Sequence, residues 1–233
     1  MIDIRPFAGL GHANHGWLDA RHHFSFADWY DPARMGWGAI RVWNDDTIAP
    51  KSGFPPHSHG DMEIVTFVRT GAITHQDSLG NKGRTAAGDV QVMSAGTGIT
   101  HAEYNLEEEA TTLFQIWILP DRAGEKPSWG QREFPRADRA GKWVTLAAGD
   151  AGGDEEVLPI RADAKVLAAK VNAGERLEYA TDPARHLYLV APTGRIVVNG
   201  VSANPRDGIA MTGEEKVEVV AEEDAEIVLV DAR

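Results

Sequence analysis

The sequence predicts an all-β fold, and three observations support this. Its apolar runs are short and rich in Val, Ile and aromatic residues. Glycine (24 residues) and proline (12 residues) recur between these runs, where they favour turns. Long stretches with helical periodicity are nearly absent. This pattern is typical of an antiparallel sandwich or barrel.

The expected strands follow one another at short intervals along the chain. In order, they are Ala39–Trp43, Ile64–Val68, Val90–Met93, Leu113–Leu119, Lys142–Leu146, Lys165–Val171, His186–Val190, Arg195–Val198, Lys216–Val220 and Glu226–Val230. Turn-forming residues bound most of these runs, so we expect short antiparallel strands throughout.

The two halves of the chain resemble each other weakly. The segment Val68–Ile73 matches Val190–Ile196, and Gly88–Met93 matches Asp207–Met211. We interpret this as two related β-barrels in tandem; the alternative is that any two β-rich halves look this similar. Prolines and glycines interrupt the pattern between residues 121 and 139, so the expected units are 1–125 and 126–233.

Composition narrows the function classes. The formal net charge of −12 argues against a protein that grips nucleic acid or an anionic membrane, although a protein partner stays open. Without cysteine, the chain cannot form disulfides, zinc–thiolate sites or a cysteine nucleophile. The first residues lack the apolar core of a signal peptide and no run is long enough to span a membrane, so we expect a cytoplasmic protein.

Two segments carry residues that could bind a metal. On a regular strand, His57, His59, Asp61 and Glu63 would all project to one side. Further on, His101 and Glu103 are again two residues apart, after a glycine-rich turn. A single His-x-His pair in a β protein is more often structural, but its combination with the second pair favours a metal site. Three imidazoles and a carboxylate suit Fe(II), Ni(II), Cu(II), Mn(II) or Zn(II), with positions left for substrate.

These segments resemble two motifs of the cupins, and more specifically the pirin family of two-barrel cupins. The first motif is matched by Gly53, His57, His59, Glu63 and Gly71. The second is matched by Gly88, Gly98, His101 and Asn105, with two extra residues and without the usual proline. The resemblance is dense from Gly11 to Asn105, continues through Leu113–Pro120 and is looser in the second half. It implies two tandem cupin (jelly-roll-like) β-barrels.

The pirin resemblance also implies a ligand set. Three histidines and a glutamate hold the metal of that family, and they correspond to His57, His59, His101 and Glu103. Other cupins use the glutamate of the first motif, here Glu63, and strand spacing alone leaves both carboxylates open. With Glu103 as ligand, Glu63 and Asp61 would orient the ligands from behind. We expect one divalent metal, Fe(II) before Mn, Ni, Cu, Co or Zn, and no metal in the second barrel.

Two functions follow from the resemblance. The first is a dioxygenase that opens the central ring of flavonols such as quercetin, consuming dioxygen and releasing carbon monoxide. A carboxylate would act as base, with Glu103 expected and Glu63 in reserve. The substrate would be small, planar and aromatic. The second is a regulatory metal or redox protein that acts through protein partners.

Other histidines are expected to be structural. His12, His15, His22 and His23 lie among aromatic residues that we expect to pack over the first barrel, and a second metal site there is the lesser alternative. His75 could reach a substrate but is more simply a turn histidine.

Overall fold

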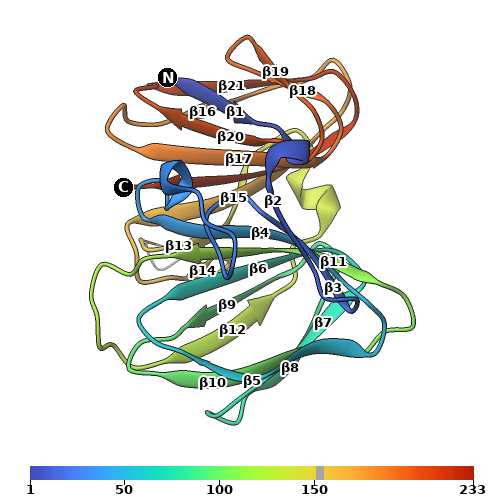
Figure 1. Ribbon diagram of the computed structural model, residues 1–233. Helices are drawn as coiled ribbons and strands as arrows, with labels where there is room; N and C mark the ends of the chain where they lie inside the picture. The colour runs from blue at the N-terminus through green and yellow to red at the C-terminus, as the bar shows by residue number, and fades with distance from the viewer. Residues whose placement is uncertain (151–154) are drawn as a thin grey trace.

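The computed structural model describes residues 1–150 and 155–233 and confirms the all-β prediction (Figure 1). Each half consists of one large and one small sheet, packed as a cupin-type sandwich and not closed into a barrel. The large sheet of the first half has the order β12 (Ser128–Arg132), β9 (Val90–Ser94), β6 (Glu63–Thr70), β11 (Thr111–Ile118), β4 (Ile40–Ile48), β3 (Leu18–His22) and β2 (Gly11–Asn14). Its small sheet has the order β5 (Ser52–His59), β10 (Ile99–Asn105), β7 (Ala72–Asp77) and β8 (Lys82–Ala86).

The second half repeats this strand order. Its large sheet has the order β1 (Ile2–Arg5), β20 (Gly208–Thr212), β17 (His186–Thr193), β22 (Ala225–Ala232), β15 (Ala164–Val171), β13 (Val144–Ala148) and β14 (Leu158–Pro159). Its small sheet has the order β16 (Arg176–Ala180), β21 (Lys216–Ala221), β18 (Ile196–Val198) and β19 (Val201–Ala203). The matched turns use glycine in the left-handed region in both halves, at Gly71 (φ 71°) and Gly194 (φ 79°).

The two large sheets pack against each other in the middle of the molecule (Figure 1). One apolar cluster joins Trp43 and Phe114 of the first half to Tyr188 and Val228 of the second. Alternate residues of each large sheet therefore point to this shared core, and the others point into their own half. The interior of the second half is filled with aliphatic side chains such as Leu189, whereas the first half holds a cavity.

Each large sheet has an edge strand that lies on the other side of the expected boundary at residue 125. β1, at the start of the chain, pairs with β20, and β12, from the expected linker, pairs with β9. The division into 1–125 and 126–233 remains a prediction of where the chain passes from one unit to the next, and these two strands tie the units together.

The expected apolar runs all lie in strands, with ends shifted by a few residues. The helical elements of the described residues are three short 3₁₀ helices, at Phe7–Gly9, Pro32–Arg34 and Arg136–Arg139. Within the described part of the chain, no helix has the length and apolar character needed to cross a membrane.

Candidate metal centre

Three of the predicted ligands converge where β5 and β10 pair. His57 lies opposite His101 in the register of these strands, and His59 follows two residues further along β5. The ring centroids of the three imidazoles are 4.4 to 5.0 Å apart, and one nitrogen of each lies within 4.8 Å of the others. Glu103, also on β10, belongs to a second group of three with His101 and His75, whose potential ligand atoms also lie within 4.8 Å of one another.

An irregularity in β5 aims its residues at this point. The pairing with β10 shifts register between the His101–His57 and Glu103–Phe54 pairs, so β5 carries one more residue there. The extra length falls at Pro55 and Pro56, which have no N–H to donate to a ladder. As a result, both Phe54 and His57 line the same cavity despite their odd spacing.

Hydrogen bonds select the tautomers of His57 and His101. His57 Nδ1 lies 2.8 Å from the carbonyl oxygen of Pro55, which can only accept, so Nδ1 carries the proton and Nε2 keeps its lone pair. His75 Nε2 donates to Asp77 at 2.9 Å. With its proton on Nε2, His75 presents the lone pair of Nδ1 to Nδ1 of His101, 3.3 Å away, and so can accept from the His101 tautomer that leaves Nε2 for a metal.

The Nε2 atoms of His57 and His101 face each other 3.1 Å apart, close enough for a proton to be shared between them when no metal is bound. A cation bound there would take the Nε2 lone pair of each ring. Burial, together with the neighbouring His57, lowers the pKa of His59 to about 4 and that of His101 to about 3. These two imidazoles are therefore neutral at physiological pH, which is the form that binds metals.

The carboxylate of Glu103 is held by two amides. Gln91 donates to Oε1 at 2.6 Å and Gln115 donates to Oε2 at 2.8 Å. Burial raises the pKa of Glu103 to about 7 although both amide bonds favour the ionised form. Each oxygen keeps a further lone pair, so Glu103 can accept a cation or a proton within hydrogen-bonding reach of the cavity.

The glutamines belong to a polar row that crosses the large sheet. His22, Asn44, Gln115, Thr66 and Gln91 occupy successive strands and are paired in register from β3 to β9. Thr66 donates to Gln115 at 3.1 Å and accepts from Gln91 at 3.3 Å. Sequence reasoning missed Gln91 and Gln115, because the pairing of distant strands brings them to Glu103.

The expectation that Glu63 shares a face with the two histidines is wrong. The chain turns between β5 and β6 at Gly60 and Asp61, whose φ is 45°, so the two strands belong to different sheets. The Glu63 side chain accepts from Ser94 Oγ at 2.5 Å and from the N–H of Arg161 at 3.1 Å, toward the second half. Glu63 does not line the cavity that the imidazoles border. Asp61 accepts from the N–H of Gly124 at 2.7 Å and orients the loop instead of a ligand.

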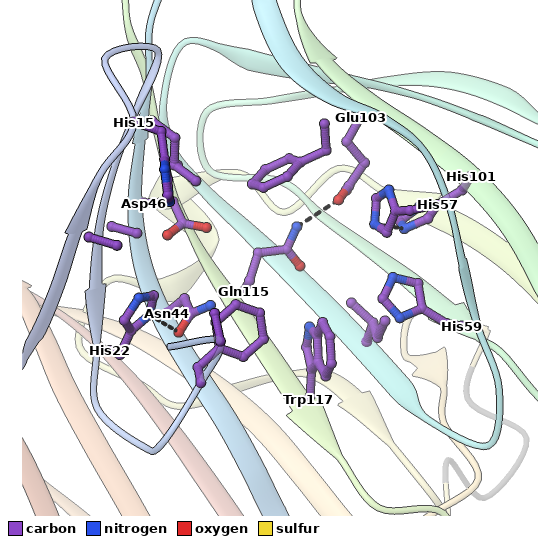
Figure 2. Close-up of a pocket in the computed structure, with 17 residues that line it drawn as sticks. His15, His22, Asn44, Asp46, His57, His59, His101, Glu103, Gln115 and Trp117 are labelled. Carbon is purple, nitrogen blue, oxygen red and sulfur yellow. Dashed lines mark hydrogen bonds between the residues drawn. The ribbon is translucent and has the colours of Figure 1, made fainter. Parts of the chain in front are cut away.

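The imidazoles close one side of a cavity of about 200 Å³ (Figure 2). Glu103, His57, His59 and His101 gather on one side, while Asn44, Asp46 and His22 lie on the opposite side, with Gln115 between them. Most of the remaining lining is apolar: Ala13, Leu18, Ala20, Phe26, Ala27, Phe54, Ile64 and Trp117.

Residues of the N-terminal segment cover this cavity, as expected. Phe26 packs edge-on against Trp117 with centroids 5.4 Å apart, and Trp17 packs in the same way against Phe54 at 5.0 Å. His15 and His22 line the cavity, but neither is in a potential metal-binding group found among the described residues. His75 is fully buried, stacked on Trp129 behind His101, and so differs from the expected turn histidine.

Fold and site together define a two-unit cupin with a candidate metal centre in the first unit. Comparison with known proteins is consistent with this. Residues 4–118 match the model of the family Pirin, and residues 142–232 match that of the quercetinase C-terminal cupin domain. The chain belongs to the pirin family.

Similar proteins cover the whole chain. A pirin-like protein of Caulobacter vibrioides is 62% identical over 100% of both chains. The quercetin 2,3-dioxygenase of Escherichia coli K12 is 41% identical over 99% of this chain and 98% of its own. The crystal structure of the bacterial pirin YhhW from E. coli, in complex with nickel(II), has a TM-score of 0.93 at 40% identity, covering 100% of this chain and 99% of its own.

Proposed function

We propose that this protein is a metal-dependent dioxygenase that opens the central ring of flavonols such as quercetin, with dioxygen consumed and carbon monoxide released. The observation that supports the proposal most strongly is the convergence of three imidazoles at a mostly apolar cavity, with the Glu103 carboxylate on the same side of that cavity. Relatives named for quercetin dioxygenase activity support it.

The proposed ligands are His57, His59, His101 and Glu103. The lone pairs left by the tautomers of His57 and His101 fit a divalent transition metal. Fe(II) is the proposed metal, and the nickel complex of the relative supports an ion of this class. When bound, the ion lowers the pKa of a hydroxyl that contacts it and brings dioxygen and the substrate together.

Glu103 is the proposed base. It takes this role when its carboxylate is released from the metal; in the metal-free site, burial raises the pKa of Glu103 to about 7, near the operating pH, where a carboxylate exchanges protons most effectively. The amides of Gln91 and Gln115 hold the carboxylate in place while it receives the proton of the substrate hydroxyl. Glu63 has no such role in this proposal, because it lies outside the cavity.

The apolar walls exclude water and hold a planar ring. Trp117 and Phe54 offer aromatic surfaces beside His59 and His57, with centroids 5.0 and 6.2 Å from the respective imidazoles. A flat polyphenol packs well against such surfaces.

Turnover of quercetin tests this proposal. The protein is loaded separately with Fe(II), Mn(II), Ni(II), Cu(II) and Co(II), and quercetin loss, oxygen uptake and carbon monoxide release are followed together. We expect equal amounts of the three with at least one metal. Full occupancy without turnover for every metal would contradict the dioxygenase and favour the regulatory role through a protein partner.

A further inference from the structure

The side of the cavity opposite the imidazoles is polar. Asp46, Asn44 and His22 line it, and Figure 2 shows them facing the metal-binding side across Gln115. Neither the metal centre nor the proposed base uses these three residues.

Strand geometry turns these side chains inward. Asn44 and Asp46 are two residues apart on β4, so both face the cavity, and Asp45 between them faces the second half of the molecule. Asp45 is neutralised there by Arg69 and Arg206. His22 lies beside Asn44 on β3 and donates to its Oδ1 at 2.8 Å.

One carboxyl oxygen of Asp46 is unpaired in the part of the chain that the structure describes. The residue is 2% exposed, and its Oδ1 has no hydrogen-bond partner among the residues that the structure describes. A buried polar atom without a partner destabilises the fold, so its position against a cavity indicates that a ligand group completes its bonding. Burial and the nearby Asp45 raise the pKa of Asp46 well above its usual range. A protonated carboxyl can both donate and accept.

We propose that Asp46, supported by Asn44 and His22, forms a second subsite that binds an uncharged hydroxyl of the substrate, remote from its metal-bound oxygen. This inference rests on the proposed function, because the proposed function determines which end of the substrate faces the imidazoles. The favoured substrates are neutral aromatic compounds with oxygen at both ends. Aromatic carboxylates are disfavoured, because the residues that line this cavity include no Lys or Arg to balance a buried negative charge.

The test compares two ring probes of similar shape on the Zn(II)-loaded protein. Binding of 4-fluorophenol and of 1,4-difluorobenzene is measured by ¹⁹F NMR. We expect wild type to prefer the phenol by about 10-fold, and Asp46→Leu to reduce this preference to about 2-fold or less. The matched control, Asp138→Leu, changes an exposed residue that does not line this cavity and is expected to keep the preference. An unchanged preference in Asp46→Leu, or no binding by wild type, would overturn the subsite.

A crystal structure of wild type with 4-fluorophenol keeps the proposal testable if Asp46→Leu does not fold. The hydroxyl is expected within hydrogen-bonding distance of Asp46, and a hydroxyl that contacts only the metal would overturn the subsite. Quercetin turnover reports on the proposed function separately. If quercetin is turned over but the preference for the phenol does not depend on Asp46, only the subsite is contradicted. If the preference depends on Asp46 but quercetin is not turned over, the subsite is supported and the dioxygenase is contradicted.

Discussion

At the scale of single residues, protons on the imidazoles decide whether a cation can bind. The Pro55 carbonyl selects the tautomer of His57, and His75, held by Asp77, supports the tautomer of His101 that binds a metal through Nε2. Each leaves Nε2 free toward the same small volume. Groups that orient ligands in this way are as much a part of a metal site as the ligands themselves.

Replacing His75 by Phe tests this orientation. Phe retains a ring to stack on Trp129 but removes the acceptor of the His101 Nδ1–H. We expect metal affinity to fall about 10–100-fold with little change in the fold. The check is a competition titration with a chromophoric chelator, with circular dichroism as the control for folding. Affinity equal to that of wild type would show that His75 has no orienting role.

The pKa of Glu103 predicts how the stability of the metal-free protein depends on pH. In the unfolded chain the carboxyl titrates near the model value of 4.5, and in the native state near 7. Between these values the native state holds more protons than the unfolded state, so the free energy of unfolding falls as the pH rises. This penalty reaches on the order of 3 kcal/mol above pH 7.

Glu103→Gln removes that penalty because the amide does not titrate. Chelator-treated wild type and variant are unfolded in denaturant from pH 5 to 7.5. We expect the difference in their free energies of unfolding to shift in favour of the variant with rising pH. The lowered pKa values of His59 and His101 change the free energy of unfolding with pH in the opposite direction to Glu103. Both proteins contain these histidines, so their contributions cancel in the difference. A difference that does not depend on pH would disprove the raised pKa.

Sequence alone led to the four expected ligands but not to their surroundings. Two His-containing pairs on separate strands, with the pirin resemblance, were enough to select His57, His59, His101 and Glu103. Gln115 and Asp46 were out of reach, because their positions depend on which strand pairs with which and in what register. Neither residue has a local signature at the sequence level.

At the scale of elements, the pairing of β5 with β10 builds the site. Spacing by two placed His101 and Glu103 on one face, as observed. The same argument failed from His57 to Glu63, because the chain leaves one sheet for the other at Asp61. Regular alternation holds within a strand and ends at a turn or bulge, which apolar patterns alone do not locate.

Gly53 sets how closely these two strands approach. A Cβ at this position would lie 2.2 Å from the carbonyl oxygen of Glu103 and 2.5 Å from Tyr104 Cα, both backbone atoms. Gly53→Ala is therefore expected to push β5 from β10, costing about 1–3 kcal/mol and weakening metal binding. Thermal unfolding and metal titration check this.

Gly9→Ala is the matched control. A Cβ there meets nothing within 4 Å, and the residue does not have a positive φ. We expect it to leave both stability and metal affinity nearly unchanged. Equal effects of the two substitutions would show that the close approach at Gly53 is unimportant.

At the scale of the whole molecule, the two halves share one strand order but differ in their interiors. The first half encloses the cavity, while the second half fills the equivalent space with residues such as Val217 and Val219 of β21. The weak internal repeat predicted this duplication. It did not predict that β1 and β12 complete the sheets beyond the expected boundary, because strands without a strong apolar run have little sequence signal.

Asp45 links the two halves at the back of the cavity wall. It is fully buried and pairs with Arg69 of the first half and Arg206 of the second. Asp45→Asn leaves both guanidinium groups without their counter-charge, so we expect a loss of about 3 kcal/mol in the free energy of unfolding. Metal content should stay the same, because the side chain points away from the site. The exposed pair Lys216–Glu178 provides the control, since Glu178→Gln should leave the unfolding midpoint unchanged.

The metal content of two glutamate variants tests the central claim most directly. Wild type, Glu103→Ala and Glu63→Ala are loaded with Fe(II) under anaerobic conditions, desalted and measured for metal per chain. One ion per chain is expected in wild type and in Glu63→Ala, with most of it lost from Glu103→Ala. Full occupancy in Glu103→Ala together with loss from Glu63→Ala would contradict the proposed centre.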